Sequence, residues 1–274
     1  MRQITKILAM ALMAVLFAGS AWAFSTWTWN LESFDYRVKV NGENTLLETI
    51  TFNDSLGLAN GPGFYSQITQ NLGGNGQIDN GDSFSEFGIL GAVIADGVNT
   101  IAFRNEDDQA RKIFYSFTDL TGKVSNYSSD TLLDLVFAPN VGTIKLFAGT
   151  DYNDENIELA SFSLVSGLGK QVNVTQGASN NNAFSFTIAM ASVRQNFWFI
   201  DGMDAFDILK EGRTVLGFAN LNANVKTFSA DNDNYYIGVE NYGNINHAVP
   251  EPGTLLLLGA GLLGLGAVAR RRKN

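Results

Sequence analysis

Alternation of apolar and polar residues with a period of two constrains the fold of this chain more than any other feature. Phe184, Phe186, Ile188 and Met190 alternate with smaller or polar residues, as expected for a strand with one face in a core. Clusters of Gly, Asn and Asp separate such runs, and the chain has 28 glycines and 28 asparagines. The expected strands cover residues 25–31, 36–40, 46–52, 83–94, 100–103, 112–117, 132–137, 143–147, 157–165, 171–174, 183–191, 196–200, 215–228 and 235–239.

These runs predict an all-β protein. We expect residues 24–248 to form a single antiparallel β-sandwich or jelly-roll-like domain, since only two prolines and no Pro-rich or Ser-rich linker interrupt them. A parallel β-helix is the alternative, although no fixed repeat period supports it. Trp27 and Trp29 alternate at the start of the domain and either face the core or line a groove. A short helical turn is expected within residues 204–210.

The N-terminus has the pattern of a secretory signal peptide over residues 1–23. Arg2 and Lys6 supply positive charge, an apolar stretch follows over residues 7–18, and Ala21 and Ala23 form an A-x-A cleavage site. The pattern predicts cleavage by signal peptidase before Phe24 and export of the remaining chain.

The C-terminal segment, residues 249–274, combines three features in order. Pro250-Glu251-Pro252 comes first, and an apolar stretch over 255–269 comes next. Its 15 residues give about 22 Å of helix, short of a hydrocarbon core of about 30 Å. The basic residues Arg270, Arg271, Arg272 and Lys273 follow, and the positive-inside rule keeps them in the cytoplasm. We therefore expect an apolar transmembrane helix over 254–269 that holds the body transiently on the outer side of the inner membrane.

This Pro-Glu-Pro, apolar and Arg-rich sequence resembles the PEP-CTERM sorting signal of Gram-negative bacteria. The resemblance implies that an exosortase, an integral-membrane protease, recognises the segment and releases or transfers the body. It also implies a bacterium that makes exopolysaccharide, with the protein ending at the cell surface or in the extracellular matrix.

Charge and composition exclude several functions. Between the two terminal segments, residues 24–250 carry 12 basic and 26 acidic side chains, a net charge of −14, which disfavours nucleic acid and anionic lipid as partners. The chain has no cysteine, so thiolate metal sites are excluded. Its one histidine, His247, lies next to the C-terminal segment, so we expect neither a Ser-His-Asp triad nor a multi-histidine metal site inside the body. His247 precedes the Pro-Glu-Pro motif closely, and we expect it to be an exposed linker residue. We expect no enzymatic activity and no required cofactor.

Calcium is one ligand for which the body offers suitable atoms, because Ca²⁺ prefers clustered carboxylate and amide oxygens. The best candidates are Asp151, Asn153 and Glu155 in one loop and Asp231 and Asp233 in another. Residues 71–82 also resemble an EF-hand loop in their Gly and final acid, but lack its acidic first and third positions. Solvated turns without any ion are the alternative for all three segments.

A carboxylate pair could hydrolyse glycosides without His or Cys. Asp201, Asp204 and Asp207 follow the aromatic run 197–199, which suggests a glycoside hydrolase or a carbohydrate-binding module as an alternative function. A buried strand followed by an acidic turn is the interpretation we favour.

Several strand and turn segments, including 81–84, 156–167, 197–201 and 215–220, resemble the flocculation-associated PEP-CTERM proteins. Together with the tail, this resemblance implies a secreted matrix or adhesion protein that binds exopolysaccharide and promotes biofilm or floc formation.

Overall fold

A computed structural model gives the fold of the chain. It describes residues 26–32, 37–40, 43–46, 48–52, 55–59, 66–96, 99–102, 112–129, 132–149, 156–173 and 182–249. The expected all-β antiparallel class is confirmed, while the predicted apolar helix at 254–269 lies outside these residues.

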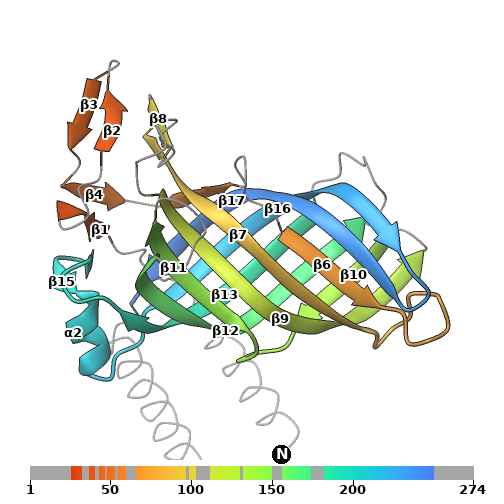
Figure 1. Ribbon diagram of the computed structural model, residues 1–274. Helices are drawn as coiled ribbons and strands as arrows, with labels where there is room; N and C mark the ends of the chain where they lie inside the picture. The colour runs from red at the N-terminus through yellow and green to blue at the C-terminus, as the bar shows by residue number, and fades with distance from the viewer. Residues whose placement is uncertain are drawn as a thin grey trace, which may run out of the picture.

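Most strands belong to one antiparallel sheet that closes on itself (Figure 1). Strand β9 pairs with β11, and the ladder continues through β12, β13, β16 and β17 to β5, β6 and β7. Strand β7 then pairs with β9 along its length, from Ser83↔Lys123 to Gly91↔Phe114. The strands of this closed sheet are β5 (Leu56–Ala59), β6 (Ser66–Asn71), β7 (Ser83–Asp96), β8 (Asn99–Ala102), β9 (Lys112–Ser129), β10 (Leu132–Phe137), β11 (Thr143–Gly149), β12 (Ile157–Asn173), β13 (Asn182–Val193), β16 (Leu216–Ala230) and β17 (Asn234–Ala248).

The core lies between the facing walls of the closed sheet. Strand β13 shows how the sequence places it there, because Phe184, Ile188 and Met190 are buried while Ser185 and Ala191 are exposed. Alternate side chains of a strand point to opposite faces, so a period-two sequence gives one apolar and one polar surface. The sandwich arrangement expected from the sequence thus takes the form of a single sheet whose opposite walls enclose the apolar side chains.

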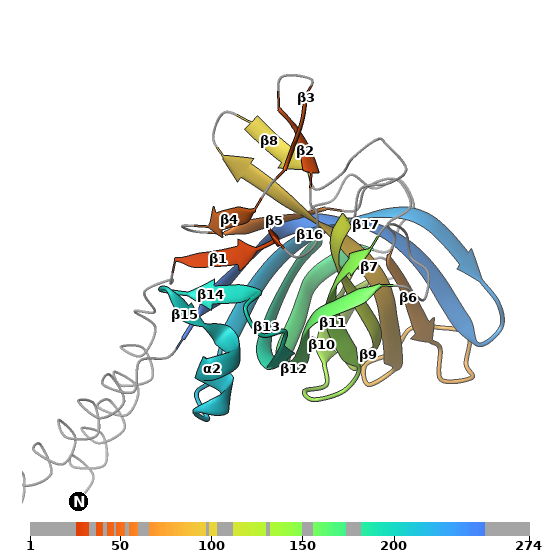
Figure 2. The ribbon, with the colours of Figure 1, turned by 60° about the vertical axis from the view of Figure 1, so that its left-hand side comes forward.

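A second, four-stranded sheet lies at one end of the closed sheet (Figures 1 and 2). This small sheet has the order β15-β14-β1-β4, and a short helix follows its edge strand. Its elements are β1 (Trp27–Asn30), β4 (Thr49–Phe52), β14 (Trp198–Ile200), β15 (Met203–Asp204) and helix α2 (Ala205–Lys210). A separate hairpin consists of β2 (Arg37–Val40) and β3 (Glu43–Leu46).

Aromatic rings join the small sheet to the end of the closed sheet. Trp27 and Trp29 are fully buried, which confirms the core interpretation of this pair. The Trp27 ring stacks on Phe52 with centroids 4.1 Å apart and on Trp198 at 5.1 Å. Trp198 in turn contacts Phe162 of β12, with ring centroids 6.2 Å apart. The small sheet therefore shares its apolar face with the interior of the closed sheet.

Candidate functional site

The end of the last strand is where the body meets the C-terminal segment. Strand β17 ends at Ala248, and Val249 packs against the core. His247 is fully buried, so the expectation of an exposed linker residue was wrong. The physical reason is strand periodicity, since Ile245 and His247 are two residues apart on the inner face of β17. Across the ladder, His247 pairs with Gly217 of β16.

Aromatic rings surround the His247 imidazole. Its centroid lies 4.6 Å from that of Trp198, 4.8 Å from that of Trp27 and 6.3 Å from that of Phe162. Neither ring nitrogen has a hydrogen-bond partner among the described residues. Burial lowers the pKa of His247 to about 3, because a charged imidazolium is poorly solvated there. His247 is therefore a neutral packing residue near the end of β17, the last strand before residue 250.

The N-terminal edge of the body lies at the same end (Figure 2). The amide of Thr26 donates to the Asp201 carboxylate at 3.0 Å, and the Asp201 amide donates to the Thr26 carbonyl at 2.8 Å. Trp27 follows directly and contacts His247. The first described residue and the last strand are thus anchored by one cluster of side chains.

The acidic candidates for glycoside chemistry have structural contacts of their own. Asp201, at φ 49°, and Gly202, at φ 79°, form the two-residue turn between β14 and β15, as an Asp-Gly pair favours. Asp204 begins helix α2: its Oδ1 accepts from the Phe206 amide at 2.9 Å and its Oδ2 from the Asn196 amide at 2.7 Å. Asp207 is exposed on the helix.

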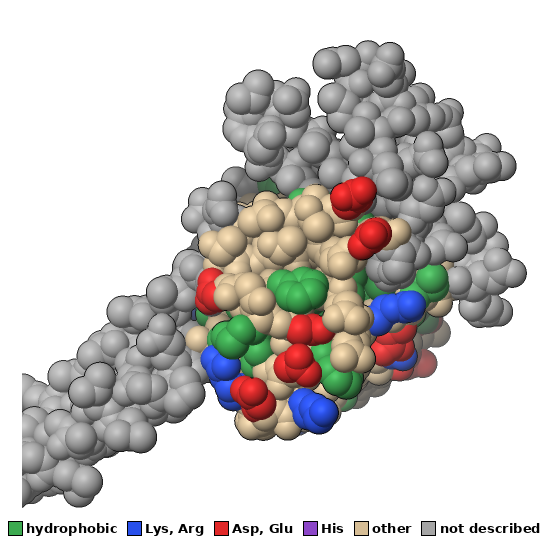
Figure 3. Space-filling model, turned by 90° about the vertical axis from the view of Figure 1, so that its left-hand side faces the viewer, with side chains coloured by type: hydrophobic (Ala, Val, Ile, Leu, Met, Phe, Trp, Pro, Cys, Tyr) green, Lys and Arg blue, Asp and Glu red, His purple; other side chains and the backbone are tan. Residues whose placement is uncertain are grey.

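The aromatic run beside these carboxylates is mostly inside the protein. Phe197 and Trp198 are buried, so neither ring face is open to a sugar. The buried strand followed by an acidic turn, which the sequence favoured, is what the structure has. Figure 3 views this end of the molecule and shows acidic side chains spread over it, with isolated hydrophobic ones between them.

The predicted calcium residues divide into two groups. Asp151, Asn153 and Glu155 lie outside the described residues. Asp231 organises the turn before β17: its Oδ1 accepts from the amides of Asp233 and Asn234 at 2.8 and 2.7 Å, and its Oδ2 from the Tyr236 hydroxyl at 2.9 Å. These hydrogen bonds lower the pKa of Asp231. Within the described ranges, no group of three His, Cys, Asp or Glu side chains is arranged to hold a metal ion.

The EF-hand-like segment is likewise built from turns. The side-chain oxygen of Asn71 accepts from the Gly73 amide at 2.9 Å, and that of Asn75 accepts from the Gln77 amide at the same distance. Asp82 Oδ2 accepts from the Asp79 amide at 2.7 Å. Side-chain oxygens of this segment thus accept hydrogen bonds from backbone amides of the same loop.

Two interior polar residues were not singled out from the sequence. Glu86 of β7 is 5% exposed and Tyr115 of β9 is 3% exposed. The signal for Glu86 was available, because Phe84, Glu86 and Leu90 share the inward face of one alternating strand. An acidic residue at such a position departs from the apolar pattern.

Comparison with known proteins identifies the C-terminal segment. Residues 248–273 match the PEP-CTERM protein-sorting motif. No curated protein and no solved structure matches the chain. In the part of the chain that the structure describes, no helix is long and apolar enough to cross a membrane. Residues Pro250, Glu251, Pro252 and Arg270 to Arg272 lie within the matched motif, whereas Ala21 and Ala23 of the signal-cleavage site lie outside the described residues.

The match overlaps the end of β17 by one residue, Ala248, and covers the segment that leaves the aromatic cluster. The motif supports export and anchoring of the C-terminus in the membrane before processing by an exosortase-type protease. The chain therefore contains a PEP-CTERM sorting motif, which indicates a secreted protein sorted by an exosortase.

Proposed function

We propose that the body is a non-enzymatic component of the extracellular polysaccharide matrix, which promotes adhesion between cells and so biofilm or floc formation. The observation that carries this proposal is the sorting motif itself, which begins where the last strand ends. Cleavage at the Pro-Glu-Pro sequence removes no residue of β17. The body then leaves the membrane with its last strand complete.

The mechanism follows from charge. The body carries a net charge of −14, so an acidic exopolysaccharide repels it unless cations lie between the two. Calcium is suited to this bridging because it binds carboxylate oxygens from more than one partner. Many weak contacts of this kind add up along a polymer with repeated sites.

The loops that contain Asp151, Asn153, Glu155, Asp231 and Asp233 are the places on the body where we expect such contacts. Exposed carboxylates also occur elsewhere, for example at Asp207 and Glu211 of the α2 end. Contacts at a specific loop therefore need to be distinguished from the effect of general acidity.

The hydrolase and carbohydrate-binding alternatives draw on Asp201, Asp204 and the aromatic run. Asp201 and Asp204 both accept backbone hydrogen bonds, and Trp198 is fully buried. These contacts account for the residues without a sugar ligand and give neither alternative support of its own.

The test begins with the intact mass of the protein recovered from the culture matrix. A chain that ends near residues 250–252 is the expected result, and a chain that runs to Asn274 and is found only with membranes contradicts the matrix role. The recovered protein is then mixed with exopolysaccharide from the same culture, with and without EDTA. Aggregation that EDTA abolishes and added Ca²⁺ restores supports the mechanism, and aggregation indifferent to EDTA overturns it.

A matched pair of variants locates the contact. Asp231→Asn with Asp233→Asn removes two charges at the loop before β17, whereas Asp207→Asn with Glu211→Gln removes two at α2. We expect the first pair to weaken Ca²⁺-dependent aggregation more than the second. Equal weakening by both pairs assigns the bridging to overall acidity, since the two pairs change the net charge equally.

A further inference from the structure

The outer face of two neighbouring strands, β16 and β17, is rich in asparagine (Figure 1). Among the strands that the structure describes, only these two contain three or more asparagines each. Asn220, Asn222 and Asn224 alternate in β16 with buried inner-face residues, so their amides lie on the outer face of the closed sheet. Asn is depleted in strands, because its side chain competes with the ladder for backbone hydrogen bonds. Formation of the strand therefore does not explain three asparagines in succession on one face.

The ladder between the two strands places further polar side chains beside these amides. Asn220 pairs with Asn244 of β17, and Asn222 pairs with Tyr242. Directly paired side chains lie side by side, and the row from Asn220 to Asn224 is about 14 Å long. Asn220 and Asn244 are exposed, and Tyr242 is 39% exposed. We call Asn220, Asn222, Asn224, Tyr242 and Asn244 the amide strip.

Short residues flank the amide strip on both sides. Strand β13 places Ala183 and Ser185 beside it, and both are exposed. Strand β5 places Gly57 and Ala59 beside it on the other side. Because the residues on both neighbouring strands are short, the amides and the Tyr242 ring stand above them. A long polymer can therefore lie over the strip.

The amide strip is uncharged at neutral pH, although the body has a net charge of −14. The next outward side chain along β17 is Glu240, and its carboxylate pairs with the Lys226 ammonium at 2.7 Å. An acidic polymer is repelled by the body as a whole, whereas a neutral polymer meets no such repulsion. Direct contact at this surface therefore favours an uncharged partner.

The chemistry of the amide strip suits sugar hydroxyls. An Asn amide donates two hydrogen bonds and accepts at its carbonyl oxygen, and a hydroxyl also donates and accepts. Amides spaced along a strand thus match hydroxyls spaced along a chain of sugars, and the Tyr242 ring offers an apolar face for the C–H side of a sugar ring. We propose that the amide strip binds a neutral polysaccharide directly, without calcium. This inference rests on the proposed matrix role and adds a second contact surface to the acidic loops.

Native electrophoresis of the exported protein through gels that contain polysaccharide tests the proposal. Two neutral probes are used: dextran, and the exopolysaccharide fraction that an anion exchanger does not retain. The retained, acidic fraction is the comparison. All gels contain EDTA, which removes the calcium-dependent contacts of the acidic loops. We expect at least one neutral probe to slow the protein and the acidic fraction to leave its mobility unchanged.

A matched pair of double variants locates the contact. Asn220→Ala with Asn244→Ala removes two paired amides of the strip, and we expect it to weaken the affinity for the neutral probe about tenfold. Thr118→Ala with Thr143→Ala removes two paired, exposed hydroxyls on β9 and β11, and we expect a change of less than about twofold. Circular dichroism of both variants shows whether the sheet is retained.

A variant of the aromatic residue tests the role of its ring. Tyr242→Phe retains the ring and is expected to keep the affinity within about twofold. Tyr242→Ala removes the ring and is expected to weaken binding at least as much as the double Asn variant.

Three results overturn the proposal. Unchanged mobility with both neutral probes means that the amide strip is only a solvated surface. Equal weakening by the two double variants means that the sugar contact lies elsewhere on the sheet, and retardation by the acidic fraction alone means that the partner is charged. Retardation by a neutral probe in EDTA supports the amide strip even where aggregation with acidic polysaccharide is indifferent to EDTA, so failure of the calcium mechanism and failure of this inference are distinguishable.

Discussion

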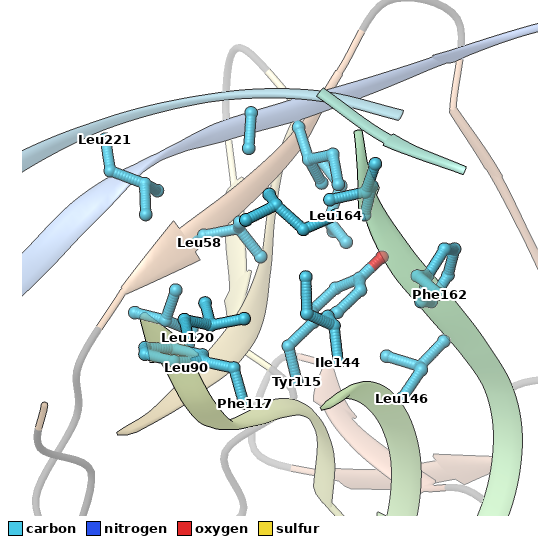
Figure 4. Close-up of a cluster of buried hydrophobic side chains, with 14 of the residues drawn as sticks. Leu58, Leu90, Tyr115, Phe117, Leu120, Ile144, Leu146, Phe162, Leu164 and Leu221 are labelled. Atoms are coloured by element: carbon cyan, nitrogen blue, oxygen red, sulfur yellow. The ribbon is translucent and has the colours of Figure 1, made fainter. Parts of the chain in front are cut away.

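Two regions of the interior contain a buried ionisable side chain with a polar atom that has no hydrogen-bond partner among the described residues, and their surroundings differ. His247 lies at the end of the closed sheet, with Trp27, Trp198 and Phe162 around its ring. Glu86 of β7 lies beside a cavity of the closed sheet, among apolar side chains such as those in Figure 4. Burial holds both groups in their neutral forms, lowering one pKa to about 3 and raising the other to about 8.

The difference indicates that burial of a neutral ionisable group has a different consequence in each region. At His247 the aromatic contacts are made within the protein, so the imidazole acts as a flat packing surface that fixes the strand leading to the sorting motif. At Glu86 the surroundings are mainly aliphatic and aromatic side chains, and Oε2 of the carboxyl has no hydrogen-bond partner among the described residues. Predictions that change one region and leave the other intact test this distinction.

The largest effect is expected from removing a ring at the aromatic end. Trp198 contacts rings of the small sheet, Trp27 and Trp29, and of the closed sheet, Phe162. We expect Trp198→Ala to lower the free energy of unfolding by about 3–5 kcal/mol, from lost burial and the space left behind. Urea denaturation measures this change.

Phe206→Ala is the matched control, because Phe206 lies on α2 next to the same sheet but is 37% exposed. An exposed substitution of this kind is expected to change stability by no more than about 0.5 kcal/mol. Similar losses in both variants would mean that the aromatic cluster does not hold the two sheets together.

The second prediction concerns Glu86. Its pKa in the folded protein lies above that of an unfolded Glu, so the folded state retains the proton between about pH 4.5 and pH 8. The contribution of Glu86 to the free energy of unfolding is fully present below pH 4.5 and is lost as the pH rises through 8. The free energy of unfolding changes by at most about 1.4 kcal/mol per pH unit in this range. Glu86→Gln removes this dependence, which denaturation across the pH range detects.

Glu158→Gln serves as the control for Glu86. The Glu158→Gln substitution is the same chemical change on the outer surface, where Glu158 pairs with Lys145 at 2.7 Å and is screened by solvent. If both variants alter the pH profile equally, Glu86 is solvated and the cavity is open to water.

The third prediction concerns His247, for which stability changes with pH in the opposite direction. His247 is neutral in the folded protein above about pH 3, whereas the unfolded chain takes up its proton near pH 6.5. The contribution of His247 to the free energy of unfolding is present above pH 6.5 and is lost as the pH falls toward 3, again by at most about 1.4 kcal/mol per pH unit. We expect His247→Phe to flatten this acidic limb relative to the original protein and to leave the Glu86 limb unchanged. A profile that is identical in the variant would place a solvated histidine at the end of β17.

The sequence allowed much of this architecture to be predicted, and the exceptions have physical causes. Period-two alternation located most strands and placed Trp27 and Trp29 in the core. His247 was misjudged because a single polar residue before Pro250 was taken for part of the tail, although it continues the inward face of β17. The inner-face position of Glu86 was visible in the same way.

Local sequence patterns could not predict that the sheet closes on itself. It depends on pairing between β7 and β9, and nothing in either strand alone specifies the partner. The cavity arises from this closure, since its lining comes from strands far apart in the sequence. A cavity of this kind requires the assembled walls, so no single strand of the sequence could reveal it.

The smallest effect is expected at a carboxylate with the opposite surroundings. Asp231 is solvent-exposed and accepts hydrogen bonds from two backbone amides and the Tyr236 hydroxyl, which lower its pKa. We expect Tyr236→Phe to raise that pKa part of the way toward its ordinary value, because the two amides remain. Carboxyl ¹³C signals followed through a pH titration measure it, with Tyr235→Phe as the control on the neighbouring residue. A rise shows that a donated hydrogen bond lowers the pKa of an exposed carboxyl here, whereas burial raises the pKa of Glu86. An unmoved pKa would mean that the two backbone amides alone hold the pKa of Asp231 low.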